Sequence, residues 1–263
     1  FEDEDWDDEE DFDMEEDPSG AAGTDNGYSP MCLTTCTPAE EAKIGFSRPV
    51  RILPGSCSAE DIILLDNSGG FMVFFLADCG DGYGIMSGSV PPGVPEDTYG
   101  RLAKKISAQG GRAVIDAYGV VLEKSLNTRP FLLRMSQYAL EMYTRKKLRT
   151  LDDVVSILRQ LQQHHHLNNI CVTLGESGAV LLDTDNSYVA TPPKTHTRST
   201  VGSGDSLLAG LVASYARGDD SPAALKLGIA CGTATTTHAG TGLCRLDEVD
   251  QLLEVLEVET LDR

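Results

Sequence analysis

The stretch STVGSGDSLLAG, residues 199–210, places two closely spaced glycines and a carboxylate at the start of an apolar run. Gly202, Ser203 and Gly204 allow the backbone to turn sharply as the predicted helix begins. Their N–H groups would then point outward beside the positive end of the helix dipole and form an anion hole. Asp205 would lie at its mouth, where a carboxylate can take a proton from a hydroxyl while a phosphoryl group is held. A helix N-terminus without a ligand is the plainer interpretation.

Two further loops of small residues follow predicted strands. The loop LGESG, residues 174–178, comes after the apolar run 170–174, and the loop SGSVPPG, residues 87–93, follows a short strand that ends at Met86. Loops at the carboxyl ends of parallel strands are where nucleotides bind in α/β sheets. Together with residues 202–205, these loops predict a phosphate-binding edge, although each could also be a simple turn.

The flanking sequence alternates short apolar runs with longer segments of helical periodicity. We expect strands over 113–115, 131–135, 170–174, 179–182 and 188–190. We expect helices over 97–109, 202–216, 222–238 and 246–256, and a further one that Thr150 opens with a capping box. The basic run 145–147 is interpreted as a helix surface. This alternation predicts an α/β fold with a mainly parallel sheet and helices on both faces.

The charge of the chain is concentrated at its beginning. The 263 residues hold 41 acidic and 21 basic side chains, a formal net charge of −20, yet no basic residue precedes Lys43 and 16 acidic ones do. We therefore expect residues 1–42 to be a disordered acidic leader and 43–263 to be the folded part, whose own net charge is −4. Short apolar runs at 50–53, 62–65 and 71–76 could be strands.

Composition also excludes several classes of partner. No cluster of basic residues suits a nucleic-acid backbone, and no apolar run approaches the roughly 18 residues of a membrane-spanning helix. The seven cysteines are scattered, and only Cys32 and Cys36 lie close together, so the spacing does not complete a zinc site. Free thiols of this kind indicate a reducing compartment, and we expect a cytoplasmic protein.

The ordered set of motifs resembles the ribokinase-like (PfkB) sugar kinases. It runs SGSVPPGVPEDTY, RAVIDA, PFLLRMSQYAL, CVTLGESGAVLL, STVGSGDSLLAG and ACGTATTTHAGTGLC, over about residues 48–258. The motif STVGSGDS is most similar to that of the phosphofructokinase branch, which includes minor-type 6-phosphofructokinase, 1-phosphofructokinase and tagatose-6-phosphate kinase. The resemblance implies a three-layer αβα sandwich, with its N-terminal portion and lid incomplete here. It also implies ATP-dependent phosphorylation of a sugar phosphate, with Mg²⁺ and K⁺ as cofactors. Relatives often form a homodimer through the lid, so a homodimer is possible here, although no lid is visible in this sequence.

The resemblance also implies roles for individual residues. Asp205 would be the general base, and the N–H groups of Gly202, Ser203 and Gly204 would form the anion hole. Ser89 would help to hold the phosphosugar. Residues implied to contact ATP are Thr173, Leu174, Gly175, Glu176, Ser177, Gly178, Thr197, Gly232, Thr233, Arg134 and Ser136. Residues implied to surround a monovalent cation are Ser199, Val201, Thr235, His238, Gly240 and Gly242.

Two departures from the family pattern bear on activity. The motif Lys-Pro-Asn-x-x-Glu, whose Glu organises magnesium in the family, falls on residues 134–139, where Ser136 replaces the Asn and Ala139 the Glu. No Gly-Gly-x-Gly-x-Asn segment and no recognisable lid occur before residue 85, although RILPG at 51–55 resembles a segment that follows the lid. A catalytically weak nucleotide-binding module derived from the same family is therefore an alternative to an active kinase.

Overall fold

The computed structural model describes residues 82–90 and 94–261. The predicted acidic leader, the three strands expected before residue 77 and residues 91–93 of the SGSVPPG loop lie outside the described residues. No helix in the described ranges is long and apolar enough to cross a membrane.

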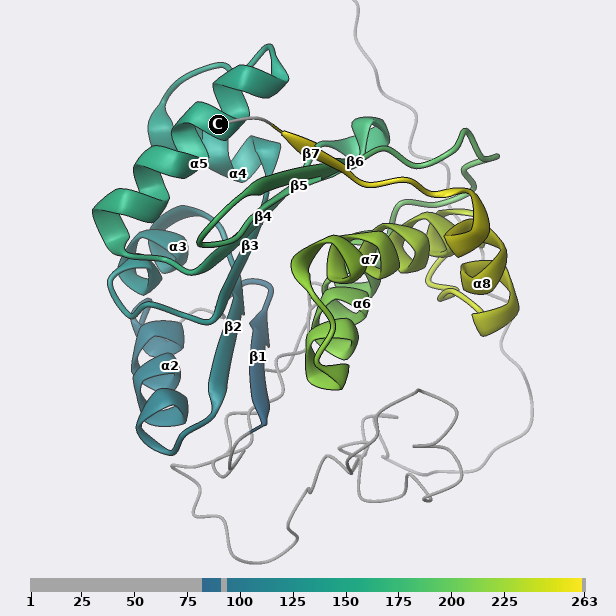
Figure 1. Ribbon diagram of the computed structural model, residues 1–263. Coiled ribbons are helices and arrows are strands. Elements are labelled where there is room, and N and C mark those ends of the chain that lie inside the picture. Colours follow the sequence, from purple (N-terminus) through teal and green to yellow (C-terminus); the bar gives the residue numbers. More distant parts are fainter. Residues whose placement is uncertain (1–81, 91–93, 262–263) are drawn as a thin grey trace, which may run out of the picture. The chain divides into compact units, whose positions relative to one another are not determined.

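The described sheet has two halves of different polarity (Figure 1). Four strands pair in parallel: β1 (Tyr83–Ser87), β2 (Arg112–Asp116), β3 (Leu132–Ser136) and β4 (Asn169–Thr173). Three more continue the sheet in antiparallel fashion: β5 (Ala179–Leu182), β6 (Ser187–Ala190) and β7 (Glu259–Leu261). The strands stand in the sheet in chain order, so all four parallel strands end at the same edge.

Helices cover both faces of this sheet, which confirms the three-layer α/β architecture (Figure 1). One face carries α2 (Thr98–Ala108), α3 (Gly119–Leu126), α4 (Gln137–Thr144) and α5 (Leu151–His165). The other carries α6 (Ser203–Arg217), α7 (Ser221–Thr236) and α8 (Leu246–Val255). The first group shares one face because crossovers between parallel strands are right-handed and here all advance in the same direction across the sheet.

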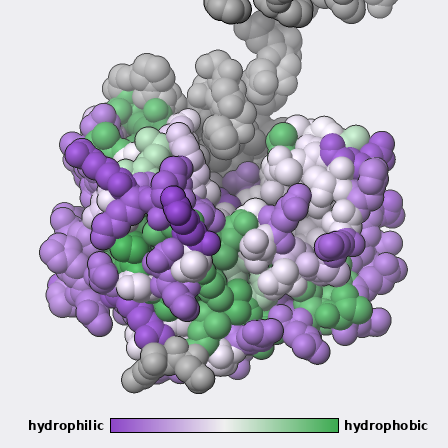
Figure 2. Space-filling view, turned by 90° about the horizontal axis from the view of Figure 1, so that it is seen from above, coloured by the Kyte–Doolittle hydropathy of each residue, from purple (hydrophilic) through white to green (hydrophobic). Residues whose placement is uncertain are grey.

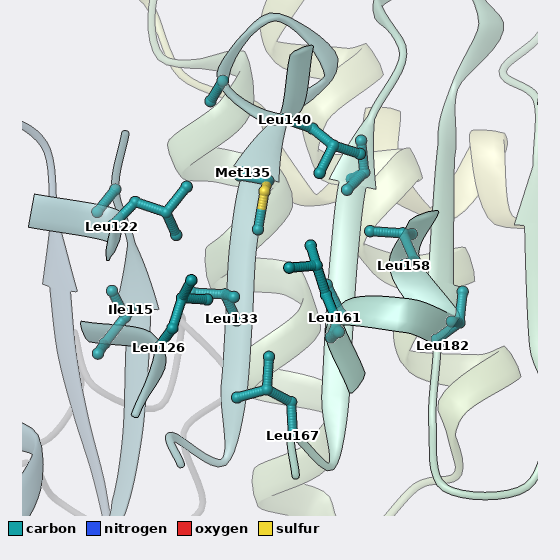
Figure 3. Close-up of a cluster of buried hydrophobic side chains, with 14 of the residues drawn as sticks. Ile115, Leu122, Leu126, Leu133, Met135, Leu140, Leu158, Leu161, Leu167 and Leu182 are labelled. Atoms are coloured by element: carbon teal, nitrogen blue, oxygen red, sulfur yellow. The ribbon is translucent and has the colours of Figure 1, made fainter. Parts of the chain in front are cut away.

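Alternation along the strands divides the buried side chains between two cores. Ile115 and Leu133 face α2–α5, within the cluster drawn in Figure 3. Their neighbours Val114 and Leu132 face α6 and α7 instead. Burial on both faces explains why the parallel strands are continuous apolar runs. Each fully buried side chain of this size contributes about 1.5–3 kcal/mol relative to its exposed state.

Most predicted elements are confirmed, and the exceptions have local causes. The capping box is present, since the Thr150 hydroxyl accepts from the N–H of Asp153 and the Asp153 carboxylate accepts from the N–H of Thr150. The helices α3 and α4 and the edge strand β7 were not predicted, because such short elements show too little periodicity. The helix-surface interpretation of residues 145–147 is wrong: α4 ends at Thr144, and Arg145 adopts a left-handed conformation with φ of 55°.

Candidate functional site

The site is built on polar side chains at the carboxyl ends of the parallel strands. Ser87, Asp116 and Arg134 pair directly across β1, β2 and β3. Side chains in register on neighbouring strands point to the same face. Here that face is the one covered by α6 and α7, because the residues two positions earlier on β2 and β3 belong to the core under those helices. Thr173 ends β4 on the same face.

A chain of hydrogen bonds connects these residues to α6. Arg134 forms an ion pair with Asp116, with Nη1 to Oδ2 at 2.7 Å, and its Nη2 donates to the Thr173 hydroxyl at 3.0 Å. The Ser87 hydroxyl lies 3.3 Å from Asp116 Oδ2 and 3.1 Å from Asp205 Oδ1. Ser87 therefore bridges two carboxylates, one within the sheet and one at the start of α6.

The ion pair at the centre of this chain is largely removed from solvent. The side chains of Arg134 and Asp116 are 13% and 12% exposed. Burial raises the pKa of Asp116, the Arg134 cation and its hydrogen bond oppose this, and the Asp205 charge adds to it. The Nε atom of Arg134 is buried with no hydrogen-bond partner in the described part of the chain. A buried cation thus stands directly beneath the first turn of α6.

The first turn of α6 has the geometry that its glycines predicted. Gly202 is the N-cap residue with φ of 78°, a left-handed conformation that favours glycine. A Cβ on Gly204 would come 2.5 Å from Nη2 of Arg134, so a side chain there would displace the guanidinium. Asp205, in the same turn, is exposed. The structure therefore brings Gly202, Ser203, Gly204 and Asp205 to the carboxyl ends of β1–β4.

The second glycine loop forms a tight turn between β4 and β5. Residues Gly175–Ser177 make a single 3₁₀ turn, and the N–H of Leu174 donates to the carbonyl of Gly178 at 2.8 Å. Gly175, Glu176 and Ser177 are exposed. This loop follows Thr173, which is hydrogen-bonded to Arg134, so the predicted ATP loop adjoins the polar chain.

Gly178 supplies a prediction about stability. Its φ of 89° is one that other residues rarely adopt, and a Cβ there would overlap the carbonyl oxygen of Ala190 on the neighbouring strand. We expect Gly178→Ala to lower the free energy of unfolding by at least about 1–3 kcal/mol, the usual cost of such a backbone conformation alone. Urea denaturation would measure it. Gly175→Ala is the matched control, because Gly175 also has positive φ (63°) but open space around it; an equal loss in both variants would contradict the overlap.

The residues implied to hold a monovalent cation come from the segment before α6, the end of α7 and the segment after α7. The Ser199 hydroxyl donates to the carbonyl of Gly240 at 2.7 Å, and the N–H of Val201 donates to Ser199. The rest already have partners within the protein: the Thr235 hydroxyl is bonded to Ser206, the His238 ring to Glu248 at 2.7 Å, and Gly242 packs against His238. The structure brings Ser199 and Gly240 together, and the cation-binding role stays a prediction.

The remaining predicted residues lie in varied surroundings. Thr197 is exposed in the segment before α6, and Ser89 is half-buried two residues after Ser87. Gly232 packs against the carbonyl of Ser203, which explains the glycine there, and Thr233 is buried beside it. The Ser136 hydroxyl accepts from the N–H of Ala139 at 3.1 Å and caps α4.

Two residues of the polar chain were not assigned a role from the sequence. Ser87 lies within the quoted SGSVPPG loop, and Asp116 directly follows the predicted strand 113–115, but only their register on β1 and β2 reveals that they meet. Their position in the sequence could have identified them, because Ser87 and Asp116 are polar residues that each end a buried strand. Within the described ranges no three His, Cys, Asp or Glu side chains are grouped as a metal site.

Comparison with known proteins agrees with this architecture. A family model described as pfkB family carbohydrate kinase matches residues 83–248. The 1-phosphofructokinase of Borreliella burgdorferi is 33% identical over 178 residues, which make up 67% of this chain and 57% of that protein. The ATP-dependent 6-phosphofructokinase isozyme 2 of Escherichia coli is 29% identical over 173 residues, 65% of this chain and 56% of the relative.

A solved structure gives the same result. Phosphofructokinase-2 from Escherichia coli, in complex with potassium, matches with a TM-score of 0.64 at 28% identity, over 67% of this chain and 57% of that one. The chain thus spans less than two thirds of the length of these relatives. Because the family model covers more than half of the chain, the protein belongs to the pfkB family of carbohydrate kinases, in its phosphofructokinase branch.

Proposed function

We propose that the protein transfers the γ-phosphoryl group of ATP to a hydroxyl of a sugar phosphate, with Asp205 as general base. The observation that carries this proposal is the position of Asp205. It is an exposed carboxylate in the first turn of α6, beside Gly202 and Gly204, at the carboxyl ends of four parallel strands. Proton acceptor and phosphate-binding N–H groups thereby share one helix turn.

The hydrogen bonds define how Asp205 would act. Ser87 donates to Oδ1 of Asp205, which orients the carboxylate and leaves its other lone pairs for the incoming hydroxyl. The sugar oxygen bonds to the γ-phosphorus, the bond to the bridging β–γ oxygen breaks, and the hydroxyl proton passes to Asp205. The N–H groups at residues 202–204 and the Arg134 cation beneath them stabilise the charge on the phosphoryl oxygens.

Nucleotide and sugar recognition follow from the surrounding residues. The loop 174–178, which is exposed at residues 175–177, would contact the ATP phosphates and ribose, and Thr197 would lie near the base. Val201 and Leu243 expose apolar side chains beside Gly202, which suits the face of a purine. Figure 2 shows that apolar residues (green) occur among hydrophilic ones (purple) on the face drawn there. The names of the relatives favour a fructose phosphate, with Ser89 as a contact.

The two implied metal cofactors fit the residues differently. The oxygens of Ser199 and Gly240 suit K⁺, the ion of the related potassium complex, which would hold the segment before α6 in place. The positions implied to organise Mg²⁺ do not fit it, because Ala139 offers no ligand and the Ser136 hydroxyl caps α4. No catalytic step is therefore assigned to Mg²⁺.

That same departure favours a second candidate function. A pfkB-derived module could bind nucleotide through residues 173–178 and 202–205 and catalyse poorly, since the acidic residue of the family motif is Ala139. Both candidates require nucleotide binding and differ only in turnover.

Calorimetry with ATP, combined with a coupled kinase assay on the full chain, separates the two. We expect ATP to bind, and turnover with fructose 6-phosphate or fructose 1-phosphate would support the kinase. Binding without turnover on either sugar would favour the module. No binding of ATP at millimolar concentration would contradict both.

A further inference from the structure

Two thiols meet where α6, α7 and the segment before α8 come together. Cys231 lies on α7, and Cys244 lies two residues before α8. Both are half-buried and unpaired by a disulfide. Neither cysteine has a role in the phosphoryl transfer proposed for Asp205.

The contacts of Cys244 hold it against the face of α7 that carries Cys231. The N–H of Cys244 donates to the Thr235 hydroxyl at 3.0 Å. Thr235 lies four residues, about one helical turn, after Cys231, so the two share a face of α7. The Thr235 hydroxyl in turn donates to Ser206 at 2.8 Å, a fully buried hydrogen bond that joins α7 to α6.

The thiol groups themselves point into this junction. A Cβ built on Gly210 of α6 would lie 3.1 Å from Sγ of Cys231, so this sulfur faces α6. The Cys231 and Cys244 thiols lie near enough to interact with each other, and the Cys244 thiol also interacts with the Thr235 and Ser206 hydroxyls. Two thiols on adjacent segments form a disulfide when rotation of their side chains lets the sulfurs meet.

The third described cysteine, Cys171, is an unreactive thiol and contrasts with this pair. Cys171 is wholly buried in β4, and burial raises the pKa of its thiol to about 12. It therefore stays protonated and beyond the reach of solutes. Among the described thiols, the pair at 231 and 244 combines access with a partner.

We infer that Cys231 and Cys244 form an oxidisable dithiol that a small-molecule disulfide converts to an intramolecular disulfide. One thiol, after losing its proton, attacks a sulfur of that disulfide, forms a mixed disulfide and releases one thiolate. The second protein thiol then attacks the mixed bond, forms the 231–244 bond and releases the other thiolate. The protein loses two hydrogens, and the small disulfide becomes two thiols.

The bond would fasten the segment 232–243 at both ends. This segment includes Thr235, His238, Gly240 and Gly242, the residues implied to surround the cation. Thr235 is hydrogen-bonded to Ser206, the residue after Asp205. The 231–244 disulfide would therefore be connected to the first turn of α6 through this one hydrogen bond. The inference does not depend on the proposed kinase activity, since the junction exists whatever the protein phosphorylates.

Peptide mass after oxidation tests the inference directly. Trypsin releases residues 227–245 as one peptide that holds both cysteines, while Cys171 lies in another peptide, 160–194. After oxidised glutathione acts on the folded full chain and free thiols are alkylated, we expect the 227–245 peptide to lose two hydrogens and take up no alkyl group. Dithiothreitol should reverse this.

Single variants provide the controls. In Cys231→Ser and in Cys244→Ser the remaining thiol should keep glutathione as a mixed disulfide, because the resolving thiol is gone. Amides of residues 237–243 should exchange hydrogen more slowly in the oxidised wild type. Two alkylated thiols in the oxidised wild-type peptide, or a bond from either cysteine to a different peptide, would overturn the inference. Unchanged amide exchange after bond formation would overturn the fastening of the segment.

Discussion

Asp205→Asn is expected to lower kcat for ATP-dependent phosphorylation by about 10²–10⁴-fold, the usual contribution of a general base. The amide keeps the shape of the side chain and can still meet the Ser87 hydroxyl, but it cannot accept the sugar proton. ATP should bind no more weakly than to the wild type, because the N–H groups of residues 202–204 remain in place. A large loss of kcat with retained ATP binding is the signature of a group that acts in the chemical step.

The measurement is a coupled assay for kcat together with calorimetry for the ATP dissociation constant. Asp152→Asn is the matched control, since Asp152 is also an exposed carboxylate in the first turn of a helix, α5, far along the chain from the site. It should leave kcat unchanged. Full activity in Asp205→Asn would exclude Asp205 as the base, whatever the activity of the control.

Arg134→Met is expected to lower the free energy of unfolding by about 3–5 kcal/mol, the cost of leaving a buried charge without its partner. Asp116 has little exposed surface and would lose its 2.7 Å ion pair, so its carboxylate could be neither solvated nor compensated. Methionine has a similar reach, which limits the contribution of a cavity. Urea denaturation followed by circular dichroism would measure the change.

Two controls make this result specific to the buried charge. Adding Asp116→Asn to Arg134→Met removes the stranded carboxylate and should recover much of the loss. Arg101→Gln removes a cation whose ion pair with Asp97 is 3.6 Å long and more than half exposed, and it should change stability by no more than about 0.5 kcal/mol. A loss in Arg134→Met as small as that of the surface variant would show that the buried pair contributes little.

The sequence was sufficient for the elements with strong local signals. The helices now seen as α2, α5, α6, α7 and α8 were predicted from apolar periodicity and helix ends, and the Thr150 capping box was predicted outright. The glycines at 202 and 204 predicted the turn that opens α6, because the need for positive φ or close approach is a property of the residue itself. The eight-residue helices α3 and α4 and the three-residue strand β7 were missed.

The identity of the polar chain depended on tertiary structure. Ser87, Asp116 and Arg134 are separated by 29 and 18 residues along the chain, yet they stand side by side. Which side chains meet across a parallel sheet depends on the register of each strand, and a slip of one residue would turn Arg134 to the opposite face. No local pattern encodes that register, because packing of the crossover helices against the whole sheet selects it.

The amino-acid sequence by itself therefore determined the α/β class, the family resemblance and the glycine turn at residues 202–205. Only the tertiary structure decided that Arg134 pairs with Asp116 beneath Gly204, and that Ser87 reaches Asp205. The physical reason is the separation along the chain of the residues that interact. Backbone conformation and helix caps arise from contacts within a few residues, whereas a buried ion pair and a bridging hydroxyl require three strands and a helix to be in place at once.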